Sequence, residues 1–373
     1  IMQGDIPSKK KIGFKVNDDL KAYLERQNRY IKLPVEYEDL SRYMSSLALL
    51  DAHGEDTLWE TVYYPESDME DLNTSLTEIY AFLKTDGNVE VLEHLSVARI
   101  DFCTFGNTHP FRVRVVNKLN DNFDHFYVKK ADSSRIYGLE LENLLSPNSM
   151  KYLVFKETMI EEHVSGIPGD DFIKTHLDTS EFNDIRIAKE FIKFNERCFV
   201  RLLGDMRSYN YVVDITPDID GNQYRLRAID FDQQSYEGRK SFYLPQFFKE
   251  NNPIVFLGVG RIILKNVKQY QLEERSLIAT RVKTSRSRVS TLFKVMISDQ
   301  ISTPKKVNQL KKELAYHHKS DTFLDCKTMG EIVYTNIKLL LHADASLLPC
   351  EFTVFNRSRS FNHCILRCWF LNN

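Results

Sequence analysis

The spacing of apolar and polar residues changes along the chain and marks a strand-rich stretch. Residues 111–116 (FRVRVV) alternate apolar and basic side chains, the period of a half-buried strand. Residues 97–105 and 123–131 are also rich in β-branched and aromatic residues, and turn clusters separate the three segments. The pattern therefore predicts an antiparallel meander of three strands.

Helical spacing flanks this meander on both sides. Apolar residues recur at helical steps over residues 19–31, 72–84 and 182–197. A further helix is predicted over 135–145, after the capping residues Ser133 and Ser134. Two more strands, residues 151–156 and 159–164, and a hairpin of residues 209–215 and 224–231 complete the expected elements.

These elements predict an α+β protein with several parts. We expect a helical extension over residues 1–92 and a part built on an antiparallel sheet over 93–167. A mainly helical part that contains the hairpin is expected over 168–345. The pattern gives no structure for a tail of residues 346–373.

Composition allows a large core and restricts the partners. The 373 residues are 42% hydrophobic and 27% charged, and the net charge of −2 argues against a dedicated nucleic-acid binder. Residues 258–320 nevertheless carry 14 Lys or Arg against 4 Asp or Glu. This basic segment predicts either a solvated helical face or a surface for an anionic partner, such as a phospholipid head group or a nucleic acid.

The chain shows no sign of membrane insertion or export. No apolar run is long enough to span a bilayer, and no charged-then-apolar leader opens the sequence. The six cysteines are scattered and form no CxxC pair. We therefore expect a cytoplasmic protein with reduced thiols and no transmembrane segment.

Candidate chemistry gathers around the predicted hairpin. Asp205 follows a helix, Asn210 comes five residues later, and Asp230 ends the return strand. Because a hairpin brings the ends of its strands together, Asn210 and Asp230 are expected to converge and to hold Mg²⁺, which prefers oxygen ligands. Asp205 would then accept a hydroxyl proton, and Arg207 would offset the charge of a transferred phosphoryl group.

These residues carry a resemblance to the protein-kinase-like superfamily. The run Asp205-x-Arg207-x-x-Asn210 resembles its catalytic loop, and the string Gly-Asp…Asn…Ile-Asp-Phe is similar to that of aminoglycoside phosphotransferases and phosphoinositide kinases. The resemblance covers roughly residues 95 to 300. It implies a two-lobed fold with a small sheet lobe and a larger helical lobe, an ATP- and Mg-dependent phosphotransferase, and a metal site of Asn210 and Asp230, with Asp232 as a further candidate.

The resemblance also implies nucleotide-binding residues upstream. Lys129 and Lys130 compete as the phosphate-binding lysine, and strand parity, which puts Lys130 on the face of Phe126 and Val128, favours Lys130. Its expected helix partner is Glu140.

The strand that would bind adenine through its backbone includes Glu162 and Val164. Gly106 lies in the only glycine turn where a phosphate loop belongs.

The sequence also departs from the family pattern. No G-x-G-x-x-G loop occurs, Leu203 replaces the usual histidine, and Asp232 stands where the Asp-Phe-Gly glycine would be. Three functions stay open at this point: an active phosphotransferase on a protein, lipid or small-molecule hydroxyl, a nucleotide-binding pseudokinase or scaffold, and an enzyme of this fold with altered chemistry such as nucleotidyl transfer.

Overall fold

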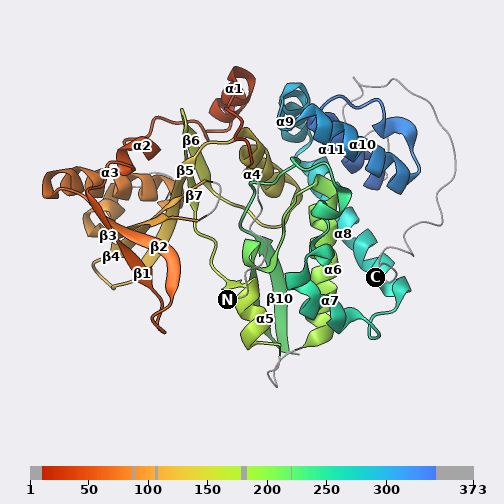
Figure 1. Cartoon of the computed structure of the whole chain (residues 1–373), viewed down its shortest axis with the longest axis horizontal. Helices are drawn as coiled ribbons and strands as arrows, with labels where there is room; N and C mark the ends of the chain where they lie inside the picture. Colours follow the sequence, from red (N-terminus) through yellow and green to blue (C-terminus); the bar gives the residue numbers. More distant parts are fainter. Residues whose placement is uncertain (1–10, 86–88, 106–107, 178–182, 220, 342–373) are drawn as a thin grey trace. The chain divides into compact units, whose positions relative to one another are not determined.

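The structure is a computed structural model that describes residues 11–85, 89–105, 108–177, 183–219 and 221–341. It divides into two compact units (Figure 1). Unit 1 comprises Ile1–Ser133 and Met150–His163, and unit 2 comprises Ser134–Ser149 and Val164–Asn373. Over the described ranges the protein is mixed α+β, with an antiparallel sheet of seven strands and eleven α-helices.

Unit 1 is built on the seven-stranded sheet, whose order is β1-β2-β3-β4-β5-β7-β6. Its strands are β1 (Ser45–Leu50), β2 (Asp56–Tyr63), β3 (Leu95–Cys103), β4 (Phe111–Asn117), β5 (Phe123–Lys130), β6 (Tyr152–Phe155) and β7 (Thr158–Glu162). Every neighbouring pair is antiparallel. The predicted three-strand meander is confirmed as β3, β4 and β5.

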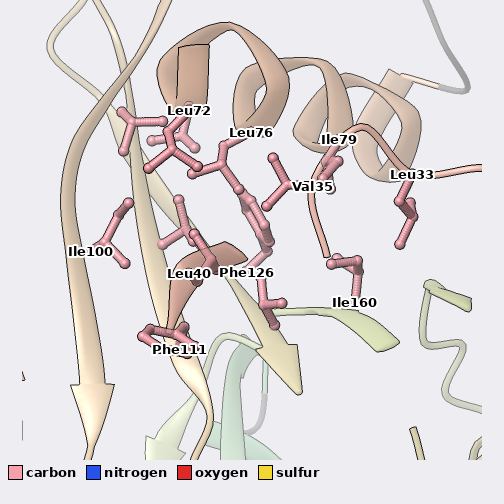
Figure 2. Packing of buried hydrophobic residues seen from close by; sticks show 14 of the residues in the cluster. Leu33, Val35, Leu40, Leu72, Leu76, Ile79, Ile100, Phe111, Phe126 and Ile160 are labelled. Atoms are coloured by element: carbon pink, nitrogen blue, oxygen red, sulfur yellow. The ribbon is translucent and has the colours of Figure 1, made fainter. Parts of the chain in front are cut away.

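The core of unit 1 lies between one face of this sheet and helix α3 (Glu66–Thr85) (Figure 1). Figure 2 shows Leu72, Leu76 and Ile79, one apolar stripe of α3, pointing toward sheet residues that include Phe111 and Phe126. Two shorter helices, α1 (Asp18–Arg26) and α2 (Tyr37–Leu40), also contribute to unit 1, and a 3₁₀ helix, η1 (Val89–His94), follows α3.

The expectation of a purely helical extension over residues 1–92 is wrong. Residues 45–50 and 56–63 form β1 and β2, which extend the sheet at its β3 side. The sequence of β1, SSLALL, lacks the alternation that a half-buried strand shows, because β1 is an edge strand with no buried side chain. Backbone pairing with β2 determines its structure.

Unit 2 combines a three-stranded sheet with most of the helices. The sheet has the order β10-β9-β8, formed by β8 (Ile167–Pro168), β9 (Tyr211–Asp218) and β10 (Gly221–Ala228). The α-helices are α4 (Ser133–Leu145), α5 (Gly169–Thr175), α6 (Asp184–Arg201), α7 (Asn252–Gly258), α8 (Leu264–Thr284), α9 (Arg286–Ser298), α10 (Pro304–His318) and α11 (Met329–Leu340). Short 3₁₀ helices are η2 (Ser208–Asn210), η3 (Lys240–Tyr243), η4 (Pro245–Phe247), η5 (Lys249–Asn251) and η6 (Asp321–Phe323).

Helix α6 is the central element of unit 2. It packs against α7, α8, α11 and strand β10. Ala188 and Ile192 of α6 form a buried cluster with Ile262 and Val267. Because α6 runs directly into the loop that carries Asp205, this packing fixes where the loop begins.

Among the described residues, no helix combines the length and the apolar character needed to cross a membrane. The predicted tail of residues 346–373 lies outside the described residues.

Candidate functional site

The loop that carries Asp205 begins where α6 ends in a left-handed residue. Leu202 has φ +54° and Asp205 has φ +60°, a conformation that aspartate adopts more readily than most residues. The backbone N–H of Asp205 donates to Phe242 O at 3.1 Å, and that of Gly204 donates to Gln233 O at 3.2 Å. A side chain at 204 would lie 2.7 Å from the Phe242 ring, so this close approach requires glycine.

A buried asparagine supports the same loop from the other side. Asn251 Nδ2 donates to Met206 O at 2.9 Å and to Pro245 O at 2.8 Å. Its Oδ1 accepts from the Tyr211 hydroxyl at 2.9 Å. With both polar atoms of its amide bonded, Asn251 ties the Asp205 loop to strand β9 and to the segment before α7.

The hairpin brings the ends of its strands together, as the sequence predicts. Tyr211 is paired with Ala228, and Ile229 N donates to Asn210 O at 3.0 Å. Asn210 Nδ2 donates to Asp205 O at 2.7 Å. Asp230 follows Ile229 directly, so Asp205, Asn210 and Asp230 share one part of unit 2.

The environment of Asp205 favours its protonated form. Burial is the largest cause that raises its pKa to about 6, the carboxylates of Asp230 and Glu250 add to this, and Arg207 opposes it. Arg207 donates from Nε to Asp205 Oδ1 at 2.9 Å and from Nη1 to Glu250 Oε1 at 2.6 Å. A carboxylate with a pKa near 6 is suited to general-base chemistry near neutral pH.

The predicted metal ligands meet a competing cation. Arg135 Nη1 donates to Asp230 Oδ1 at 2.7 Å and to Asp232 Oδ1 at 2.6 Å. The part of the chain that the structure describes contains no group of three or more His, Cys, Asp or Glu placed to hold a metal ion. Magnesium would fit through the side-chain oxygen Oδ1 of Asn210 and the carboxylate of Asp230, which is 34% exposed, if phosphate and water oxygens completed its shell.

The two candidate lysines lie on opposite faces of β5. Lys130 shares the face of Phe126 and Val128, as parity predicts, yet it is exposed and pairs with Glu38 at 3.0 Å. Lys129 is buried and pairs with Glu161 at 2.7 Å. Both ammonium groups therefore have a carboxylate partner within unit 1.

The expected helix partner of the lysine is also engaged. Both oxygens of Glu140, a fully buried residue of α4, accept from Arg288 Nη2 of α9, at 2.9 and 2.8 Å. The sequence predicted a lysine as the partner of Glu140. The structure gives Glu140 an arginine partner, Arg288, which lies 148 residues further along the chain.

The remaining nucleotide-binding candidates have structural partners or cannot be described. Glu162 accepts from Lys151 N at 2.6 Å and pairs with Lys84 at 3.5 Å, and its own N–H donates to Lys151 O. Val164 is buried. Gly106 lies outside the described residues.

Unit 1 also contains an open hollow beside Lys130. Its volume is about 530 Å³, and its lining includes Tyr37, Thr108, His109 and Lys130. Lys129 does not line it. The hollow therefore lies on the side of β5 that parity assigned to Lys130.

Part of the basic segment 258–320 is used inside unit 2. Arg275 pairs with Glu196, and Lys306 pairs with Glu237. Lys311 donates to two main-chain carbonyls. An anionic partner of the segment stays a prediction, because other lysines and arginines of the segment are exposed. They include Lys265, Lys268, Lys283, Arg286, Lys305 and Lys312.

Sequence reasoning missed the residues that hold this site in place, Arg135, Glu250 and Asn251. Each is distant in sequence from the group it contacts, and Asp230 lies 95 positions after Arg135. Arginine is seldom fully buried without a partner, and no local pattern around residue 135 marks Arg135 as buried.

The two lysines should differ sharply in their effect on stability. We expect Lys129→Met to lower the free energy of unfolding of unit 1 by about 3–5 kcal/mol, because it removes the cation that pairs with the buried carboxylate of Glu161. Lys130→Met should cost at most about 1 kcal/mol, since its pair is exposed. Urea unfolding of both variants measures this difference, and equal losses would contradict it.

Comparisons with known proteins give the chain no family. No family model matches it, and neither does any curated protein. Among the solved structures that match it, two have a TM-score of 0.25 each. One, "Titin kinase and its flanking domains", is 13% identical, with 67% of this chain and 47% of that chain covered. The other, the autoinhibited serine kinase domain of the giant muscle protein titin, is 12% identical, with 70% and 84% covered. The chain thus spans about half the length of the first structure, and at this TM-score neither likeness establishes a shared fold.

Proposed function

We propose that this chain is a kinase-like phosphotransferase that uses ATP and Mg²⁺ to phosphorylate a hydroxyl acceptor. The observation that carries the proposal is the convergence of Asp205, Asn210 and Asp230 in unit 2, with a pKa of about 6 for Asp205. Phosphoryl transfer uses a carboxylate that positions the nucleophile and oxygen ligands that hold Mg²⁺, and these three residues match those two parts.

Each residue has a distinct role in this proposal. Asp205 accepts the proton of the acceptor hydroxyl, whose oxygen attacks the γ-phosphorus while the bond to the leaving ADP oxygen breaks. Asn210 and Asp230 are the residues that would hold magnesium, which neutralises phosphate charge when bound. Arg207, held by Asp205 and Glu250, orients the Asp205 carboxylate.

The finer fold assignment belongs to the same proposal. We assign the chain a two-lobed protein-kinase-like fold because of the order of its elements. The meander β3–β5, helix α4, strands β6 and β7, and then a helical part with the β9–β10 hairpin follow one another as in that family. The short β1–β2 pair is an addition at one edge of the sheet.

A transfer assay tests the proposal. The full chain is incubated with γ-³²P-labelled ATP and Mg²⁺, and both phosphate release and label on protein, lipid and small-molecule hydroxyls are measured. Asn210→Ala and Asp230→Asn should each lower the rate by at least about a hundredfold, because a metal ligand is lost. The matched control is Asp214→Asn in the same hairpin, whose partner is Arg227. Wild-type turnover in Asp230→Asn would refute the proposed function.

A nucleotide-binding pseudokinase is the second candidate. Two contacts favour it: Arg135 bonds Asp230, and Arg288 bonds Glu140, so that both acids have arginine partners. An increase in Tm with ATP, in a protein that neither transfers nor releases phosphate, would select this function.

A further inference from the structure

Arg135 and the two acids after strand β10 form a compact charge cluster. A single nitrogen, Arg135 Nη1, lies 2.7 Å from Asp230 Oδ1 and 2.6 Å from Asp232 Oδ1. The side chain of Arg135 is 1% exposed and that of Asp232 is 12% exposed. Asp230 Oδ1 accepts a second bond, from Asp232 N at 3.0 Å. The two carboxylates are thus joined through one buried cation.

The position of this nitrogen is the position a bridging metal would take. Magnesium binds carboxylate oxygens at about 2.1 Å, so an ion that bridged the same two oxygens from the same side would overlap with Arg135 Nη1. A guanidinium and a divalent ion therefore exclude each other between Asp230 Oδ1 and Asp232 Oδ1.

Helix α4 keeps Arg135 in place. The hydroxyl of Ser134, the preceding residue, donates to Gln234 O at 2.6 Å. Gly138 lies so close to Phe231 and Gln234 that a Cβ there would be 3.0 and 3.1 Å from their Cβ atoms. The side-chain amide of Gln234 in turn donates to Arg201 O at 2.6 Å. The first turns of α4 are therefore docked on the segment that carries both acids, which fixes the backbone of Arg135 beside them.

We propose that Arg135 is a built-in cation that takes the place of a second divalent ion. Asp232 is then a partner of Arg135 and not a metal ligand, and this cluster binds no more than one divalent ion, through Asn210 and Asp230. The inference rests on the proposed function only for that one ion. The exclusion of an ion between Asp230 Oδ1 and Asp232 Oδ1 follows from the position of Arg135 Nη1 and does not need that ion.

Counting bound Mn²⁺ tests the proposal without any assay of activity. The full chain is titrated with Mn²⁺ and free Mn²⁺ is followed by electron paramagnetic resonance. Arg135→Met should bind one more Mn²⁺ per chain than wild type, because the guanidinium no longer occupies the position between Asp230 Oδ1 and Asp232 Oδ1. Arg135→Lys, which keeps the charge, should bind the same number as wild type.

A second readout is thermal stability. Arg135→Met should have a lower Tm than wild type, and Mn²⁺ at about a hundred times its Kd should raise that Tm by roughly 5 °C or more. Arg288→Met is the matched control, because it also strips an arginine from a buried carboxylate but leaves only the single acid Glu140. Mn²⁺ should not restore its Tm.

Asp232→Asn decides the matter even if Arg135→Met does not fold. In the presence of Arg135, this variant should bind Mn²⁺ with the number and affinity of wild type. A loss of one ion, or a tenfold weaker affinity, would make Asp232 a metal ligand and overturn the proposal, as would an unchanged count in a folded Arg135→Met. A wild type that binds no Mn²⁺, with one ion gained in Arg135→Met, would refute the Asn210–Asp230 ion of the proposed function and support the role of Arg135.

Discussion

Asp205→Asn is expected to lower kcat/KM for phosphoryl transfer by roughly 10²–10⁴-fold, the usual contribution of a general base. Asparagine has the shape of aspartate, and its oxygen still accepts a hydrogen bond from Arg207, so the loop should keep its structure. The amide cannot accept the proton of the acceptor hydroxyl. The labelled-ATP assay measures the loss, and Asp214→Asn in the hairpin should retain normal rates.

The pH dependence of the rate separates a base from a structural residue. Because the pKa of Asp205 is about 6, kcat/KM of the wild type should rise about tenfold per pH unit below pH 6 and level off above it. The residual activity of Asp205→Asn should not show this rise. If kcat/KM of Asp205→Asn still rises with pH and has its midpoint near pH 6, another group is the base.

As the pH rises through 6, the contribution of Asp205 to the stability of the folded protein should fall while the rate of phosphoryl transfer rises. The pKa of Asp205 is raised from 3.8 in the unfolded chain to about 6 in the folded protein, so the folded state binds more protons between these values. The contribution of Asp205 to stability is therefore fully present below pH 4 and is lost as the pH rises through 6. Above pH 6 the charged form costs at most roughly 3 kcal/mol. Asp205→Asn should accordingly match or exceed the wild-type Tm at pH 7.5, and a lower Tm would mean that the loop has been damaged.

The sequence predicted the elements whose residues alternate or repeat regularly. In β4, residues Phe111, Val113 and Val115 are buried while Arg112 and Arg114 lie on the other face, which is the pattern that the sequence shows directly. Helix α6 was predicted because one face of it is apolar. In both elements, burial of one face is what selects the structure, so the pattern carries the information.

Edge strands and ion-pair partners could not be predicted in the same way. Strand β1 buries none of its side chains, so no hydrophobic pattern marks it. Glu140 was expected to pair with a lysine of the sheet, but Arg288 of α9 bonds it, and both residues belong to unit 2. Such choices depend on which helices meet, and a single sequence does not state this.

In the candidate site, too, local contacts could be predicted from the sequence and distant ones could not. Because the two strands of a hairpin pair locally, the sequence predicted that Asn210 would lie near the end of the return strand, where Asp230 follows. The arginine that joins Asp230 to Asp232 comes from α4, and no local rule connects residue 135 with residue 230. Predictions based on neighbouring residues thus found the candidate ligands but not the cation that competes for them.

Arg197→Met is expected to cause the largest loss of stability in unit 2, about 3–5 kcal/mol in the free energy of unfolding. The buried guanidinium of Arg197, on α6, donates to Glu190 Oε1 at 2.6 Å and to Leu226 O of β10 at 3.2 Å. It also pairs with Glu274 of α8 at 3.2 Å. Burial alone would lower the pKa of Arg197, but the two carboxylates outweigh it and raise the pKa overall. Methionine would fill much of the space and leave Glu274 buried without a cation.

Two further variants assign this loss to the ion pairs. Arg261→Met, in the segment between α7 and α8, removes an exposed arginine that pairs with Asp184, and it should cost at most about 1 kcal/mol. Adding Glu274→Gln to Arg197→Met should recover part of the stability, because it removes the uncompensated charge, and the double-mutant cycle from urea unfolding gives the size of the coupling. Equal stability of the single and double variants would mean that packing of the arginine stem, and not its charge, joins α6 to α8.

The junction of α6 with β10 also supports the candidate site. Helix α6 leads directly into the Asp205 loop, and Glu190 of α6 accepts from Leu226 N of β10 at 3.1 Å. Loosening this junction should therefore displace the hairpin that carries Asn210 and Asp230.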